Sequence, residues 1–167
     1  MSNKTIEIKR LTLENWPDLK IIRLDALKSD PLGFLSSYAV DVKKPDLHWQ
    51  RSFENAEKAI FGVYDGTDII GMGGLHPEKD TPRAARLGGG YIKSAYRGQG
   101  LGGQLLQIRI DWARASGLYD AVYVSHRQNN AASQAMISKA GFAHIKTQEI
   151  AWPDGRMDNE MIYRLTL

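Results

Sequence analysis

The chain has 167 residues, of which 43% are hydrophobic and 25% charged, and its 22 basic and 19 acidic residues give a formal net charge of +3. This length and ordinary globular composition predict one domain, residues 1–167. Cysteine is absent, which excludes disulfides, thiolate zinc sites and a cysteine nucleophile. Like charges form no long run, and no apolar stretch approaches the ~18 residues of a membrane span. We therefore expect a cytoplasmic protein that binds neither nucleic acid nor membranes.

The predicted elements alternate between strands and helices along the chain. An alternating strand at 6–11 precedes a helix that starts at Asn15-Trp16-Pro17 and stops at Asp30-Pro31. A loop and a short helix at 46–55 follow, then a hairpin of strands 60–64 and 69–75 around an Asp-Gly turn. The remaining elements are strand 86–93, helix 102–116, strand 121–124, helix 131–140, and strands 142–150 and 161–165. This order predicts a mixed α/β fold.

A glycine-rich segment joins strand 86–93 to the clearest helix of the chain. Gly98, Gly100, Gly102 and Gly103 allow the backbone to close around a phosphate, and Arg97 adds a cation. A helix start also presents unpaired N–H groups and a partial positive charge. The segment therefore favours a diphosphate site, although such a turn can also simply join two elements.

Three kinds of phosphate-binding loop are conceivable here. A Walker loop requires Gly-Lys-Ser/Thr, which is absent. The dinucleotide fingerprint is present as Gly98, Gly100 and Gly103, with Asp120 about 20 residues further on. That acid precedes strand 121–124 instead of following it, and too little chain remains for a doubly wound sheet. A nucleotide-dependent oxidoreductase is therefore disfavoured.

The third kind of phosphate-binding loop is indicated by a resemblance to a known protein family. Residues 97–102, Arg-Gly-Gln-Gly-Leu-Gly, resemble the Arg/Gln-x-x-Gly-x-Gly/Ala motif of the GNAT family of N-acetyltransferases. Asn130, Ser133 and Gly141-Phe142 resemble that family's second motif, and the element order is the family's order. Residues 24–49 also resemble family members of unassigned substrate.

The resemblance implies a single-domain GNAT-like fold, a mixed, mostly antiparallel sheet flanked by helices, with strands 4 and 5 splayed apart. Acetyl-CoA would be the cosubstrate, with its pantetheine arm in that gap, and no metal would be needed. Asn130 would lie near the pantetheine, although a helix N-cap explains it equally well. The implied coenzyme-binding residues are Tyr91, Ile92, Lys93, Arg97, Gly98, Gln99, Gly100, Leu101, Gly102, Gly103, Asn130 and Ser133.

The sequence indicates the catalytic residues less clearly than the coenzyme-binding residues. Many family members have a tyrosine seven residues after the asparagine, proposed to protonate the leaving thiolate, but this chain has Ile137. Tyr123, Ser125 and His126 are the substitutes we consider. Our first candidates for the general base are Glu78 and His76, followed by Glu160, and each can also be read as an ordinary solvated side chain.

The resulting hypothesis is an N-acetyltransferase that moves acetyl from acetyl-CoA to a primary amine by direct attack in a ternary complex. Its alternative is a non-catalytic module that senses acyl-CoA. The acceptor is a small-molecule amine or a peptide N-terminus, and the sequence does not choose between them. Phe34, Tyr38 and Trp49 lie in the region that lines the acceptor pocket of similar proteins, which are often homodimers.

Overall fold

The computed structural model describes residues 5–167, so residues 1–4 of the expected domain lie outside the described part. The strands form one seven-stranded sheet in the order β1-β2-β3-β4-β5-β7-β6. Neighbouring strands are antiparallel except for β4 and β5, which are parallel. This confirms the predicted mixed, mostly antiparallel sheet. The strands are β1 (Ile6–Arg10), β2 (Ala59–Asp65), β3 (Asp68–Pro77), β4 (Ala84–Ile92), β5 (Ala121–Arg127), β6 (Ala143–Ala151) and β7 (Met157–Thr166).

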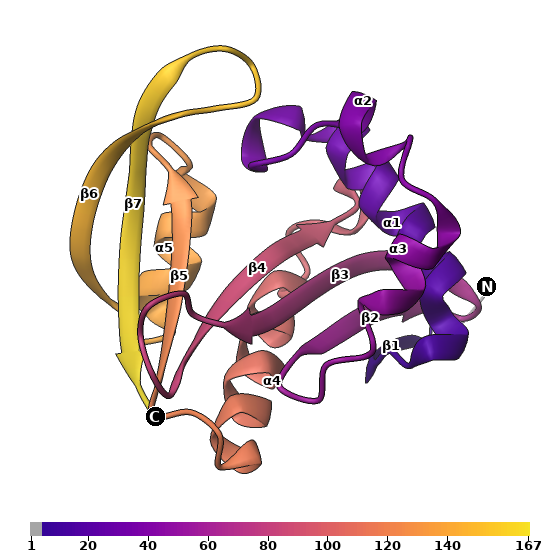
Figure 1. Cartoon of the computed structure of the whole chain (residues 1–167), viewed down its shortest axis with the longest axis horizontal. Helices are drawn as coiled ribbons and strands as arrows, with labels where there is room; N and C mark the ends of the chain where they lie inside the picture. The colour runs from indigo at the N-terminus through magenta and orange to yellow at the C-terminus, as the bar shows by residue number, and fades with distance from the viewer. Residues whose placement is uncertain (1–4) are drawn as a thin grey trace.

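Helices cover both faces of this sheet (Figure 1). The first three helices lie in front of β2, β3 and β4 in this view, while the last two lie behind the sheet. Between residues 5 and 167, no helix combines the length and the apolar character needed to cross a bilayer. The helices are α1 (Trp16–Ser29), α2 (Tyr38–Asp41), α3 (Asp46–Arg51), α4 (Leu101–Ser116) and α5 (Ala131–Lys139).

Two hydrophobic clusters hold the helices to the two faces of the sheet. Leu105 and Ile110 of α4 belong to one cluster together with Val63 of β2. Ile22 of α1 belongs to the other, together with Tyr64, the next residue of β2. Successive residues of a strand point to opposite faces, so a single strand supplies both layers. Each fully buried Leu or Ile contributes about 1.5–3 kcal/mol of transfer free energy.

Strands β4 and β5 separate after a short paired stretch. Their register covers only Ala84–Arg86 of β4 against Ala121–Tyr123 of β5. Beyond Arg86, β4 continues to Ile92 beside β3 alone, whereas β5 continues beside β7. The two strands meet near the C-terminus and diverge toward α2 and the tip of the β6–β7 hairpin (Figure 1). The predicted splay of strands 4 and 5 is therefore confirmed.

Some element boundaries differ from the prediction. α3 ends at Arg51 instead of 55, because Asn55 turns the chain by accepting a hydrogen bond from the Glu57 N–H. The stretch expected to be loop contains α2, whose Asp41 is buried against tertiary partners that local sequence does not show. β7 begins at Met157 instead of 161, since the hairpin ladder with β6 extends to Ala151↔Met157.

Candidate active site

The glycine segment forms the entrance to α4. β4 ends at Ile92, a short 3-10 turn follows, and α4 begins directly after Gly100. Gly98 and Gly100 have φ angles of +76° and +78°, in the left-handed region where only glycine is unstrained. The first hydrogen bond of α4 runs from the Gln104 N–H to the Gly100 carbonyl. The amides of the three residues between them have no helical partner, so the loop presents N–H groups at a positive helix end.

A cavity of about 300 Å³, here called the loop cavity, lies against this segment. It extends from the glycine loop to Gly90 of β4 and to the first turns of α5. Asp30, Arg109 and Met136 also line it and were not predicted as site residues from the sequence. Lys93, Gln99 and Gly103 lie outside its lining. The other nine predicted coenzyme residues, Tyr91, Ile92, Arg97, Gly98, Gly100, Leu101, Gly102, Asn130 and Ser133, line the loop cavity.

Arg97 is held at the edge of the loop cavity by its own chain. Its Nε donates to the Ile92 carbonyl at 2.9 Å, and its guanidinium lies 5.8 Å from the centre of the Tyr91 ring. Nη2 is 3.9 Å from a carboxylate oxygen of Asp30, a long contact between two half-exposed side chains. The guanidinium therefore keeps nitrogens available for an anion at the loop.

Tyr91 forms part of the wall beneath this arginine. Its hydroxyl donates to Asp25 at 2.8 Å. Burial raises the pKa of Tyr91, and the hydrogen bond to Asp25 raises it further. The phenol therefore stays protonated at neutral pH and fixes the end of β4 to α1.

The start of α5 explains two of the residues taken from the second motif. Asn130 is the N-cap of α5, and its side-chain oxygen accepts the Ser133 N–H at 3.1 Å. The N-cap interpretation is thus correct, although both residues also line the loop cavity. Ile137 is only 1% exposed and belongs to the core cluster under α4. The position at which the family resemblance implied a tyrosine is therefore core in this chain.

Arg109 of α4 is a buried cation with no carboxylate partner in the described part of the chain. Its Nε donates to the Leu105 carbonyl, and Nη1 donates to the carbonyls of Gly74 and Gly88 at 3.2 and 3.3 Å. A Cβ at Gly73 would lie 2.9 Å from the guanidinium carbon, so glycine there makes room for it. Burial lowers the pKa of Arg109 to about 10, which leaves it charged at neutral pH.

A second cavity, here called the splay cavity, has a volume of about 440 Å³. Its lining includes Gly88 and Gly89 of β4, while Gly90 lines the loop cavity. The glycine run thus borders both cavities at the point where β5 no longer pairs with β4. The lining also includes Arg23, Phe34, Leu35, His76, Arg86, Leu87, Ser125, Trp152 and Glu160.

The first candidates for general base are placed differently from one another. Glu78 forms an ion pair with Arg86 at 2.5 Å and does not line the splay cavity. His76 lines it, but its side chain is exposed and Nδ1 lies 2.9 Å from the Pro77 carbonyl. Tyr123 lines neither of these cavities, and its ring lies 5.9 Å from the Arg86 guanidinium. Glu78 is therefore engaged and Tyr123 lies outside both cavities, which leaves His76, with an exposed ring, as the one of the three that lines the splay cavity.

Glu160 of β7 has the more suitable surroundings. It is 6% exposed, lines the splay cavity, and accepts hydrogen bonds from Ser125 at 2.6 Å and Gln148 at 2.8 Å. Arg127 lies opposite it in the β5–β7 register, but binds Asp154 and Asp158 at 2.9 and 3.0 Å instead. Within residues 5–167, Glu160 has no cationic partner.

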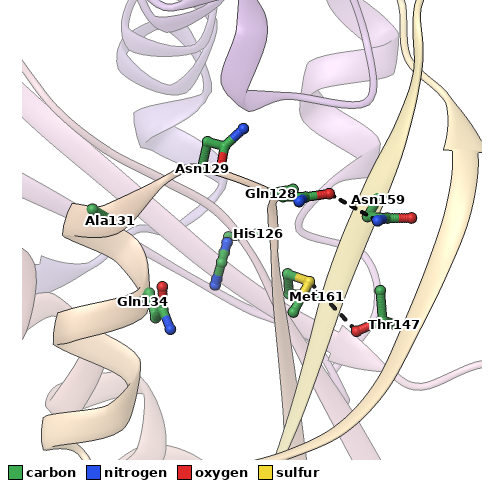
Figure 2. A pocket seen from close by; sticks show the side chains of 8 residues that line it. All are labelled: His126, Gln128, Asn129, Ala131, Gln134, Thr147, Asn159 and Met161. Atoms are coloured by element: carbon green, nitrogen blue, oxygen red, sulfur yellow. Dashed lines mark hydrogen bonds between the residues drawn. The ribbon is translucent and has the colours of Figure 1, made fainter.

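His126 lines the splay cavity and also borders a third cavity on the side of α5. Figure 2 shows its ring between Gln134 of α5 and Met161 of β7. The Nδ1–H donates to the Arg127 carbonyl at 2.7 Å, because a carbonyl can only accept, and Nε2 then accepts from the Tyr163 hydroxyl at 3.0 Å. Both ring nitrogens are thus occupied.

Of the three aromatic residues predicted near the acceptor, two line cavities and the third is exposed. Phe34 lines the splay cavity, and Trp49 lines an adjoining hollow beside α3. Tyr38 lines neither. No group of three or more His, Asp or Glu suited to a metal ion occurs among residues 5–167.

Comparison with known proteins identifies the family. The family model described as the acetyltransferase (GNAT) family matches residues 16–142. The chain belongs to this family. The matched residues include α1, which contributes Arg23 to the splay cavity, and the glycine loop. No curated protein sequence matches the chain.

Solved structures with the same fold include several acetyltransferases. The GNAT-family acetyltransferase of Streptococcus pneumoniae superimposes with a TM-score of 0.79 at 17% identity, covering 98% of this chain and 100% of the other. The yncA protein of Salmonella typhimurium, solved with its cofactor acetyl-CoA, has a TM-score of 0.81 at 17% identity, covering 97% and 94%. The ribosomal-protein-alanine N-acetyltransferase of Brucella melitensis has a TM-score of 0.78 at 20% identity, covering 96% and 99%. At these identities the likeness establishes the shared GNAT fold.

Proposed function

We propose that this protein transfers an acetyl group from acetyl-CoA to a primary amine by direct attack in a ternary complex. The observation that carries the proposal is the pair of cavities that border the same glycine run, one leading from an anion-binding loop and the other facing Glu160. Such a pair allows two substrates to meet at the gap between β4 and β5. The structural similarity to yncA, solved with acetyl-CoA, supports this choice of coenzyme.

The residues of the loop cavity fit the coenzyme. The unpartnered amides after Gly100 and the guanidinium of Arg97 suit a diphosphate. The backbone of β4 beyond Arg86 has no β5 partner, so an amide-bearing arm can pair with it. Acetyl-CoA supplies an activated thioester, which the chain directs toward the glycine run.

Glu160 is the base of the proposed mechanism, in place of Glu78, which is engaged by Arg86. An ammonium group entering the splay cavity loses a proton to Glu160, directly or through the Ser125 hydroxyl that already contacts it. The neutral nitrogen then forms a bond to the acyl carbon, and the carbon–sulfur bond breaks with its electron pair leaving on sulfur. The nitrogen, which now carries one proton too many for an amide, releases that proton to water, and water passes it to the thiolate. A thiol has a pKa of about 8.5, so the thiolate accepts this proton and Ile137 needs no replacement.

The acceptor is a small-molecule amine or a peptide N-terminus. The ribosomal-protein-alanine N-acetyltransferase among the similar structures supports a peptide acceptor only through its shared fold. Charged side chains of both signs, Arg23, Arg86 and Glu160, line the splay cavity where the acceptor would bind.

Calorimetric titration with acetyl-CoA tests the coenzyme step, with NAD as the control ligand. We expect micromolar binding of acetyl-CoA that Arg97→Glu reduces about a hundredfold or more, because a guanidinium near a diphosphate is replaced by a carboxylate. Arg114→Glu, on the exposed side of α4, is the matched control, since it makes the same change of charge away from the loop cavity. Absence of binding to the folded wild-type chain would refute the proposal.

Turnover is tested by thiol release across a panel of amines. Wild-type protein should release thiol with at least one amine, and Glu160→Gln should lower kcat by about 10² or more, the usual contribution of a general base. Acetyl-CoA binding without turnover of any amine would instead support an acyl-CoA sensor.

A further inference from the structure

The splay cavity contains two charged regions that lack full compensation. Arg23 of α1 and Glu160 of β7 both line it, together with Gly88 and Gly89 of the glycine run. Each region attracts a group of opposite charge, so the pair indicates what kind of molecule the cavity accepts.

Arg23 carries the surplus positive charge. Its Nε donates to Asp41 at 3.3 Å, and its guanidinium stacks over Phe34 at 4.9 Å. Asp41 is shared with Lys44, whose Nζ lies 2.7 Å from the other carboxylate oxygen. One carboxylate thus serves two cations. Nη1 and Nη2 of Arg23 have no partner among residues 5–167, and Nη1 lies 4.0 Å from where a Cβ on Gly89 would be.

Glu160 carries the surplus negative charge. Its hydrogen bonds come from a hydroxyl and an amide, and no cation within residues 5–167 neutralises it. Arg86 is the other cation of this cavity, but Glu78 binds it at 2.5 Å. An ammonium group is therefore the natural partner of Glu160, and a carboxylate is the natural partner of the open edge of Arg23.

We infer that the acceptor is an amino acid, a small molecule with both a primary amine and a free carboxylate. The amine faces Glu160, the carboxylate binds Arg23, and Phe34, Leu35, Leu87 and Trp152 surround an apolar side chain. This inference rests on the proposed function, because it names the acceptor of that same site. A polyamine would bring additional cations against Arg23 and Arg86. A peptide N-terminus would leave Arg23 without its carboxylate.

The test compares acceptors that share one side chain. Leucine, leucinamide and isoamylamine differ only in the carboxylate, its amide or its absence, and spermidine represents polyamines. We expect kcat/KM for leucine to exceed that for leucinamide and for isoamylamine by about tenfold or more, the value of one charge-assisted pair. Equal rates with the three acceptors, or a preference for leucinamide or spermidine, would overturn the inference while leaving the acetyltransferase proposal standing.

Variants of Arg23 assign the preference to its guanidinium. Arg23→Gln should lower kcat/KM for leucine by about tenfold, mainly through KM, and leave isoamylamine within about twofold. Arg23→Lys keeps the charge and should retain part of the preference. Arg114→Gln, on the exposed side of α4, is the matched control. An equal loss with both acceptors would indicate a structural role and contradict the inference.

A binding measurement separates this inference from the proposed function. Leucine titrated into the protein saturated with CoA should bind, and isoamylamine should bind about tenfold more weakly. Leucine binding without turnover would support the acceptor class and refute the transferase. Turnover of amines with no leucine preference in binding or rate would support the transferase and refute the acceptor class.

Discussion

Arg109→Met removes the buried cation beneath the glycine run. The carbonyls of Gly74 and Gly88 each lose a charged donor, and such hydrogen bonds contribute about 1.5–3 kcal/mol each. Removal of an unpaired buried charge offsets part of that loss, since its desolvation costs several kcal/mol. We expect the free energy of unfolding to fall by about 2–4 kcal/mol. Acetyl-CoA affinity should fall as well, because Arg109 lines the loop cavity.

Urea denaturation followed by linear extrapolation measures the change in the free energy of unfolding. Arg114→Met, at a half-exposed position of the same helix, should change it by less than about 0.5 kcal/mol. Gly73→Ala should destabilise wild-type protein by about 1–3 kcal/mol, because its Cβ presses on the guanidinium. The same substitution should cost less in the Arg109→Met background, where a flexible thioether chain replaces the guanidinium. Additive effects, or a loss below about 1 kcal/mol for Arg109→Met, would refute this account.

Three further predictions concern the loop and α2. Gly100→Ala should lower stability by about 1–2 kcal/mol because φ is +78°, whereas Gly103→Ala should raise it by about 0.5–1 kcal/mol, both by urea denaturation. Asp30→Asn removes a negative charge beside the diphosphate loop and should tighten acetyl-CoA binding about threefold by calorimetry, and weaker binding would contradict this. Burial alone would raise the pKa of Asp41, but hydrogen bonds from Lys44 and Ser36 and the charge of Arg23 lower it below 3.8. The difference in free energy of unfolding between wild-type protein and Asp41→Asn should therefore be full above about pH 4 and should shrink as the pH falls through the lowered pKa. A difference that does not change with pH would contradict this prediction.

The loop was predictable because its requirements are local. Left-handed backbone at positions 98 and 100 needs glycine, and a helix start needs no partner elsewhere in the chain to expose its amides. Arg109 was missed, although it lies four residues after Leu105 and eight after Leu101, on the apolar face of α4. A charged residue on that face, together with glycines in the facing strands, was the available signal.

The choice of base depended on register, which the sequence does not reveal. Arg86 reaches Glu78 only because β3 and β4 pair with Pro77 opposite Ala85. Glu160 similarly meets Gln148 through the β6–β7 register. Pairing across strands is set by the whole sheet, so a carboxylate that is salt-bridged and one that is not look alike in the sequence.

Arg109 and Glu160 carry opposite charges on the two sides of the glycine run, and this arrangement suits the charge separation of the proposed reaction. Arg109 lies against the glycine run from the side of α4, and Glu160 faces the splay cavity that borders the same run. Attack by an amine places negative charge on the acyl oxygen and positive charge on nitrogen. A fixed cation near the acyl group and a fixed anion near the amine would stabilise that separation without reorganisation. Arg109→Lys should therefore retain more of kcat than Arg109→Met when both variants are saturated with acetyl-CoA. Equal kcat in both variants would mean that Arg109 only stabilises the glycine run.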